Sequence, residues 1–236
     1  MPDVTFPTPR GNQPGYLAKP EGDGPWPGVV VVHEIFGLND DIRQIADRFA
    51  ANGYLTLAPD LFAGGWKLAC IVAAFRQLKA RQGEMFDALD AARAVLVGRD
   101  DCTGQVGVAG FCMGGGFALL AAPRFAFGAS SVNYGQVPED ADALLAGACP
   151  IVGSYGAQDR GTRGMAERLD LALAVNGVPH DVKEYPEAGH SFMNRHDGPI
   201  TQVLGKVIHA GYSGPAAEDA WTRILAFFGQ HLGAAS

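Results

Sequence analysis

Short apolar runs along the chain alternate with longer segments in which apolar residues recur at helical spacing. Residues 28–32 read Gly-Val-Val-Val-Val, the continuous apolar run expected of a central strand covered on both faces. Similar short runs predict further strands at residues 54–58, 105–109, 128–134, 150–155 and 181–185. Because strand and helix patterns alternate throughout, we expect an α/β fold with a mostly parallel, doubly wound sheet flanked by helices.

The helical segments have recognisable limits. Apolar side chains spaced three and four apart predict a helix after residue 40, which Asn39 or Asp40 can cap and Gly53 can end. A long helical stretch over residues 67–97 is expected to break near Gly83. Further helices are expected at residues 117–122, 141–146, 163–176 and 216–230. The first 20 residues are rich in Pro and Gly and predict one or two short antiparallel edge strands.

Composition points to a compact core and narrows the class of partner. The 236 residues are 47% hydrophobic and 18% charged, without an internal repeat or linker, so we expect one domain over residues 1–236 with no large cap domain. The net charge of −7 and the lack of a Lys/Arg run argue against nucleic acid or an anionic membrane surface as partners. A monomer or small homo-oligomer is expected.

Sequence features that the chain lacks predict the location of the protein and whether it needs a metal or cofactor. The first residues show no basic segment followed by an apolar one, and the apolar runs are too short to span a bilayer, so we expect a cytoplasmic protein. The four cysteines show neither a C-x-x-C pair nor zinc-ligand spacing. We therefore expect no metal and no cofactor.

The most informative motif is Gly-Phe-Cys-Met-Gly-Gly-Gly at residues 110–116, which lies between a predicted strand and a predicted helix. Strand, G-x-C-x-G, helix matches the nucleophile elbow G-x-S-x-G, with sulfur replacing the hydroxyl. The following helix directs free N–H groups and a partial positive charge at Cys112, which favours the thiolate. The alternative is a glycine-rich turn with a cysteine of the core.

Two further groups follow in the order that a catalytic triad of this type requires. Asp159 lies just after the strand at 150–155, and His190 lies on a loop after the strand at 181–185. The carboxyl ends of parallel strands share one edge of the sheet, so both side chains should approach Cys112. The alternatives are a turn or cap role for Asp159 and a surface position for His190, with His196 as the rival histidine.

Four signatures together resemble the dienelactone hydrolases, α/β-hydrolases that use cysteine. They are His-Glu-Ile-Phe-Gly at 33–37, Gly-Phe-Cys-Met-Gly-Gly at 110–115, Gly-Ala-Gln-Asp at 156–159 and Ala-Gly-His-Ser-Phe at 188–192, and the resemblance covers nearly the whole chain. It implies Cys112 as nucleophile, His190 as base, Asp159 as acid and Glu34 as an additional glutamate. It also implies an oxyanion hole made by two backbone N–H groups, those of Ile35 and Met113.

Glu34 also has a physical case of its own. A carboxylate at the end of a buried strand needs a partner, and beside Cys112 it can accept the thiol proton or compete for it. The resemblance implies that this glutamate keeps the sulfur partly protonated until substrate arrives, which would protect it from oxidation. The alternative is that Glu34 caps a helix or pairs with Arg43.

The chemistry that follows is hydrolysis of a small lactone or activated ester through an acyl–cysteine intermediate. A broad-specificity carboxylesterase or thioesterase, or a non-catalytic binding protein of the same fold, are the alternatives. The resemblance implies an arginine four positions after the histidine that binds a substrate carboxylate; that position is Asn194, with Arg195 next to it. We name Arg195 as the tentative substrate cation, with Arg76 and Arg81 as further candidates. Apolar walls are expected from Phe36, Trp66, Tyr134 and Phe192.

Overall fold

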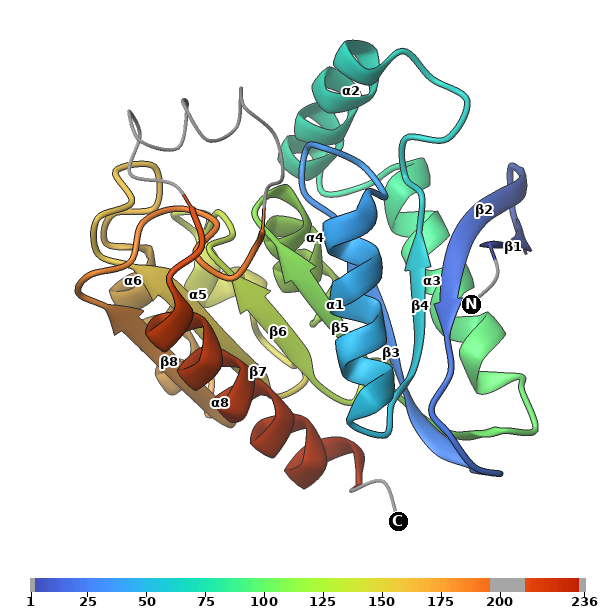
Figure 1. The fold of residues 1–236 in the computed structure, drawn as a ribbon. Helices are drawn as coiled ribbons and strands as arrows, with labels where there is room; N and C mark the ends of the chain where they lie inside the picture. The colour runs from blue at the N-terminus through green and yellow to red at the C-terminus, as the bar shows by residue number, and fades with distance from the viewer. Residues whose placement is uncertain (1–2, 196–210, 234–236) are drawn as a thin grey trace.

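In the part of the chain that the structure describes, the strands form one eight-stranded sheet, in the order β1-β2-β4-β3-β5-β6-β7-β8 (Figure 1). The computed structural model describes residues 3–195 and 211–233. The strands are β1 (Asp3–Thr8), β2 (Gly11–Ala18), β3 (Trp26–Val32), β4 (Leu55–Pro59), β5 (Cys102–Phe111), β6 (Ser130–Asn133), β7 (Ile151–Gly156) and β8 (His180–Tyr185). The helices are α1 (Asp40–Ala51), α2 (Lys67–Ala80), α3 (Glu84–Val97), α4 (Met113–Ala121), α5 (Ala141–Leu144), α6 (Met165–Val175) and α8 (Gly214–Leu232).

The sheet is parallel from β4 to β8 and antiparallel at its N-terminal side. β1 pairs antiparallel with β2, and β2 pairs antiparallel with β4. The other neighbours pair in parallel. The predicted α/β fold is confirmed, as are the two antiparallel strands near the N-terminus. Of these two strands, β1 lies at the edge of the sheet and β2 does not, because β2 lies between β1 and β4.

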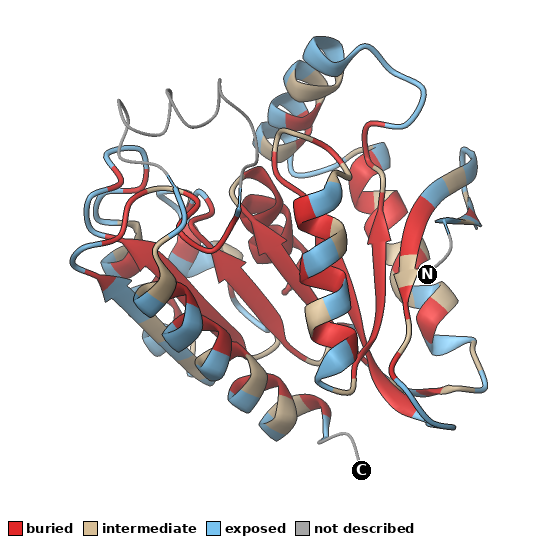
Figure 2. Ribbon diagram, in the orientation of Figure 1, coloured by how far each residue is buried: buried red, intermediate tan, exposed pale blue. Residues whose placement is uncertain are grey.

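Helices cover both faces of the sheet, and the side chains of the central strand β3 pack against both helix layers. Its alternate valines face opposite layers: Val29 and Val31 pack with residues of α1 and α8, and Val30 and Val32 pack with residues of α3 and α4. Figure 2 shows the central strands β3 to β7 largely buried, with exposed residues on the strands β1, β2 and β8 and on the outer sides of the helices. A strand buried on both sides reads as a continuous apolar run, as the valines of this strand do.

Most helix limits agree with the sequence patterns. The side chain of Asn39 accepts a hydrogen bond of 3.0 Å from the N–H of Ile42, so Asn39, and not Asp40, caps α1. The break between α2 and α3 falls at Gly83 as expected. α4 begins at Met113, four residues before the apolar run that predicted it. Three glycines at 114–116 conceal this start, because glycine is a poor helix former.

The carboxyl ends of the parallel strands lie along the upper edge of the sheet in Figure 1, and α2 stands above this edge. Loops after β3, β5, β7 and β8 therefore meet there. In the described ranges no helix is long and apolar enough to cross a bilayer. Residues 3–195 and 211–233 also contain no group of three His, Cys, Asp or Glu side chains placed to hold a metal ion.

Candidate active site

Cys112 occupies a sharp turn between β5 and α4. Its backbone has φ 53° and ψ −114°, a conformation that residues with a side chain rarely adopt. A methyl group on Gly110 would lie 2.0 Å from the carbonyl oxygen of Gly114, and one on Gly114 would lie 2.2 Å from that of Val32. These glycines are therefore required by close backbone contacts, and the turn is the strand-to-helix elbow that the motif predicts.

The structure brings His190 and Asp159 to this cysteine. The Nε2 atom of His190 lies 3.0 Å from the Sγ atom of Cys112, and its Nδ1 atom lies 2.5 Å from Oδ2 of Asp159. Asp159 is 5% exposed and also accepts hydrogen bonds from the N–H of Gly161, at 2.8 Å, and the hydroxyl of Thr162, at 2.7 Å. The carboxylate is thus held by three donors and orients the imidazole toward the sulfur.

These contacts change the charge that His190 carries. Burial lowers its pKa, but the hydrogen bonds to Asp159 and Cys112 outweigh burial and raise the pKa to about 10. Burial opposes ionisation of Asp159, yet its hydrogen bond to His190 leaves its pKa below the usual value. The favoured state at neutral pH is therefore an imidazolium between a carboxylate and the sulfur, the arrangement found where a cysteine acts as nucleophile.

Glu34 lies beside the histidine loop and is 2% exposed. Its Oε1 accepts a hydrogen bond of 2.5 Å from the hydroxyl of Ser191, the residue after His190. Burial raises the pKa of Glu34 to about 7, although the Ser191 hydrogen bond and the His190 charge act in the opposite direction. Arg43, the alternative partner, forms its ion pair with Asp3 at 2.6 Å. At neutral pH Glu34 can therefore both hold and release a proton.

His33 shapes the loop that carries Glu34. Its ring is fully buried, with Nδ1 2.6 Å from the carbonyl oxygen of Glu34, and its Nε2 accepts the N–H of Leu61 at 3.1 Å. Burial lowers its pKa, which agrees with a neutral ring that donates from Nδ1. The sequence analysis included His33 in the signature at 33–37 but gave it no role of its own. Its place directly before Glu34 was the signal for a role in positioning the loop.

The two backbone groups expected to form the oxyanion hole come from separate loops. Met113 is the first residue of α4 and is 3% exposed, and the first N–H groups of a helix have no partner within it. Ile35 lies in the loop after β3 and is half-buried. The residue after the nucleophile and one from the early strand–helix loop are the two donors that this elbow uses.

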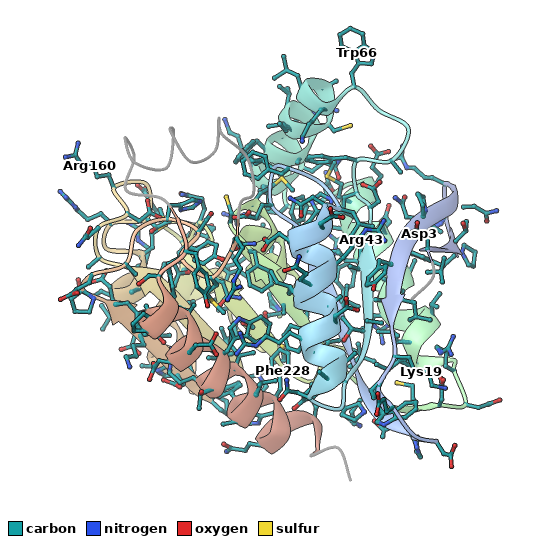
Figure 3. The ribbon with its side chains drawn as sticks, in the orientation of Figure 1. Asp3, Lys19, Arg43, Trp66, Arg160 and Phe228 are labelled. Carbon is teal, nitrogen blue, oxygen red and sulfur yellow. The ribbon has the colours of Figure 1, made fainter. Side chains whose placement is uncertain are left out.

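The four residues expected to form apolar walls differ in burial: two lie in the core, one is half-buried and one is exposed. Tyr134 is 1% exposed, and its ring meets that of His190 edge-on with centroids 5.4 Å apart. Phe192 lies in the core between Tyr134 and Tyr185. Phe36 is half-buried, with the Nζ atom of Lys67 5.6 Å from its ring centre. Trp66 is 89% exposed and points away from the molecule (Figure 3).

Asn194 belongs to a buried hydrogen-bond network that the motifs did not reveal. Its Nδ2 donates to Oδ2 of Asp41 at 2.5 Å, and its Oδ1 accepts the hydroxyl of Tyr134. The other oxygen of Asp41 accepts the backbone N–H of Arg195 at 2.7 Å. The network joins the His190 loop to the first turn of α1. An acidic residue in a first helical turn was its only sequence signal.

The candidate substrate arginines point elsewhere. The Arg195 guanidinium lies over the Tyr212 ring, 4.4 Å from its centre, and donates to the Tyr212 hydroxyl at 3.1 Å. Arg81 forms an ion pair of 2.6 Å with Asp140, and Arg76 lines a surface cleft with Arg124. The rival histidine, His196, lies outside the described residues.

Comparison with known proteins identifies the family of the chain. The profile of the dienelactone hydrolase family matches residues 14–232. A Yersinia pestis protein provisionally named carboxymethylenebutenolidase is 31% identical, over 97% of this chain and 88% of its own. One from Methylorubrum extorquens with the same provisional name is 30% identical, over 97% and 80%. The crystal structure of a Klebsiella pneumoniae protein, provisionally a dienelactone hydrolase, has a TM-score of 0.79 at 28% identity and covers 97% of this chain and 98% of its own. The chain therefore belongs to the dienelactone hydrolase family.

Proposed function

We propose that this hydrolase cleaves a lactone or activated ester through an acyl–cysteine intermediate on Cys112. The observation that carries the proposal is the 3.0 Å approach of His190 Nε2 to the Cys112 sulfur, with Asp159 on the other ring nitrogen. A nucleophile, a proton-transfer group and an orienting carboxylate in one line are the requirement for this type of catalysis.

In the first half-reaction, the Cys112 thiolate attacks the substrate carbonyl carbon and forms a carbon–sulfur bond. The carbonyl oxygen becomes an oxyanion, and the backbone N–H groups of Ile35 and Met113 stabilise it. When the intermediate collapses, the bond to the leaving oxygen breaks and the His190 imidazolium supplies its proton. The product is an alcohol or enol and a thioester on Cys112.

In the second half-reaction, His190 is neutral and takes a proton from a water molecule. The resulting hydroxide attacks the thioester, and the same two N–H groups stabilise the second oxyanion. Collapse breaks the carbon–sulfur bond, releases the carboxylic acid and restores the thiolate–imidazolium pair. Asp159 keeps the imidazole in one orientation throughout, because its carboxylate stays bonded to Nδ1.

We assign Glu34 the role of controlling the protonation of Cys112 before the substrate binds. A buried carboxyl group with a pKa of about 7 can hold a proton near the sulfur or give it up within the physiological range. All four cysteines of the chain are free thiols. A reducing compartment such as the cytoplasm, where we propose the protein acts, would keep Cys112 in the state that the reaction needs.

Sulfur as the nucleophile favours substrates with good leaving groups. A thiolate leaves readily from a tetrahedral intermediate. The intermediate formed from an amide would therefore expel the sulfur and revert to substrate, whereas the one formed from an enol lactone or activated ester would release the oxygen leaving group. A lactone or an activated ester is therefore favoured over a peptide. A broad carboxylesterase or thioesterase would use the same catalytic groups. These alternatives are distinguished from a lactone hydrolase by comparing kcat/KM for a lactone with kcat/KM for simple esters and thioesters.

The decisive experiment follows the acyl group on the protein. Mass spectrometry of wild-type protein mixed rapidly with p-nitrophenyl acetate should show one acetyl group on Cys112, with a burst of p-nitrophenolate. Cys112→Ala should abolish both the burst and turnover. Cys70→Ala removes another partly buried thiol and should retain both. Undiminished turnover in Cys112→Ala would overturn the proposed mechanism.

A further inference from the structure

We infer that helix α2, together with Trp66 at its start, is a docking surface for an anionic lipid membrane. The inference goes beyond the proposed chemistry and does not depend on it. Two observations carry it: an apolar stripe that α2 presents to solvent, and an excess of positive charge along the same helix. Each alone is an ordinary surface feature, but together they match the chemistry of an anionic lipid surface.

The apolar stripe of α2 faces away from the rest of the protein. Leu68, Val72 and Phe75 are spaced four and three positions apart, so they share one side of the helix. Their exposed fractions are 73%, 62% and 48%. The buried residues of α2, Ala74 and Gln77, lie on the side that packs against the protein. Figure 2 shows the outward side of this helix exposed, and an exposed apolar surface of this kind is typical of an interaction site.

Trp66 extends this apolar surface beyond the end of the helix. It directly precedes α2, is 89% exposed and points away from the molecule (Figure 3). A protein partner would have to supply a pocket for this protruding ring. The interface of a bilayer needs no such pocket, because it accepts the apolar ring and the polar N–H of an indole together.

The charge of this segment differs from that of the whole chain. The net charge of −7 argues against an anionic membrane as a partner, but residues 61–83 contain two lysines and two arginines and no Asp or Glu. Two nearby carboxylates offset part of this charge: Asp140, which pairs with Arg81, and Asp87, which lines a cleft with Arg76. Four cations against two carboxylates leave the surface of α2 positive.

This positive charge favours a membrane over a second copy of the chain as the occupant. Arg76 lies next to Phe75, and Lys79 follows Phe75 by four positions, so both exposed cations border the stripe. Two copies packed through their stripes would therefore bring these cations together, and they would repel one another. Anionic headgroups attract the same cations while the acyl region takes up the apolar side chains.

Docking through α2 would also turn the active-site edge of the sheet toward the lipids. α2 stands above the carboxyl ends of the parallel strands (Figure 1). At its first turn, the Nζ atom of Lys67 lies 5.6 Å from the ring centre of Phe36, in the loop after β3. A substrate dissolved in the membrane would therefore enter from the docked side.

The test follows the emission of Trp66 as vesicles are added. The other two tryptophans, Trp26 and Trp221, are 5% and 2% exposed, so a change in emission reports on Trp66. With vesicles of phosphatidylcholine and phosphatidylglycerol in equal parts, we expect a saturable blue shift and cosedimentation of the protein. With phosphatidylcholine alone, the affinity should be about tenfold or more lower, because each cation near an anionic surface contributes about fivefold. No shift with the mixed vesicles, or equal binding to both, would overturn the inference.

Two matched pairs of substitutions then locate the docking surface. Leu68→Gln with Val72→Gln removes part of the stripe and keeps Trp66, so the affinity for mixed vesicles should fall about tenfold or more. The control is Leu171→Gln with Val175→Gln on α6, where the two side chains are 57% and 75% exposed and the helix also carries exposed acidic residues. The control should bind as the wild type does. An equal loss of affinity in both pairs, at unchanged Tm, would contradict docking through α2.

The remaining measurements test the charge and the alternative occupants. Arg76→Gln with Lys79→Gln should lower the affinity by about fivefold for each charge, and sodium chloride should weaken wild-type binding. Binding that responds to neither would refute the electrostatic part of the inference. Trp66 emission already shielded in buffer, or a dimer that Leu68→Gln with Val72→Gln dissociates, would show that protein covers the stripe and would overturn the inference.

Discussion

The hydroxyl of Ser191 donates a hydrogen bond of 2.5 Å to the carboxylate of Glu34, across 157 positions of the sequence. This bond ties the loop that carries His190 to the loop that carries Ile35. It also favours the ionised form of Glu34, but burial is the larger effect, and the pKa of Glu34 stays raised at about 7. The hydroxyl therefore helps to set the pH at which the site changes its protonation.

Ser191→Ala should raise the pKa of Glu34 further, because it removes a donor to the charged form. A hydrogen bond to a charged group contributes about 1.5 kcal/mol, which corresponds to about one pH unit. We expect the acidic limb of the kcat/KM profile to move up by about that amount. The measurement is a pH series with a neutral activated ester. Glu34→Gln should lack this limb, and a Ser191→Ala profile that matches the wild type would disprove the link.

Glu34→Gln should stabilise the protein at alkaline pH more than at acidic pH. The folded-state pKa of about 7 lies above the ordinary value of 4.5, so the folded state keeps a proton that the unfolded state releases. Wild-type stability consequently falls as pH rises from 4.5 to 7, by up to about 3 kcal/mol, while glutamine does not titrate. The gain in Tm over the wild type should be larger at pH 8 than at pH 5.

The control for this prediction is Glu139→Gln, which changes an exposed glutamate. It should show no comparable pH dependence relative to the wild type. A Glu34→Gln gain that is equal at both pH values would mean that burial of this carboxylate does not limit stability.

Gly110→Ala and Gly116→Ala form a matched pair within the nucleophile elbow. A Cβ at Gly110 would lie 2.0 Å from a backbone oxygen, so the turn must distort, and we expect loss of stability by several kcal/mol and loss of activity. A Cβ at Gly116 would meet only the Leu78 side chain at 3.4 Å. Because alanine favours a helix by about 1 kcal/mol, Gly116→Ala should be neutral or stabilising. Urea unfolding and ester turnover measure both effects, and equal behaviour of the two variants would contradict this account of the elbow.

Tyr134→Phe separates the hydroxyl of Tyr134 from its ring. The variant leaves the Asn194 oxygen without its buried donor, which should cost about 1–3 kcal/mol of stability. The ring contact with His190 remains, so kcat should change little once the protein is folded. Tyr134→Ala removes both and should lower kcat as well. A large loss of kcat in Tyr134→Phe at full folding would instead assign the hydroxyl a direct part in the reaction.

Local patterns in the chain were sufficient for most of the architecture and for the order of the triad candidates. The buried run of β3, the break at Gly83 and the glycines around Cys112 are signals carried by neighbouring residues. Asp159 and His190 could be named because parallel strands bring their carboxyl ends to one edge. The early start of α4 was missed, because the close contacts that require Gly114 and Gly115 come from the ends of β3 and β6.

The remaining features of the site depend on packing between segments far apart in sequence. The direction of a side chain is decided by what surrounds it in space, and no local pattern specifies that. Arg195 follows Asn194 directly, yet its guanidinium lies on Tyr212 at the surface while the Asn194 amide is buried between Asp41 and Tyr134. The sequence by itself therefore determined which groups are candidates for the chemistry. Only the tertiary structure decided which charges surround them, because burial and distance arise from packing.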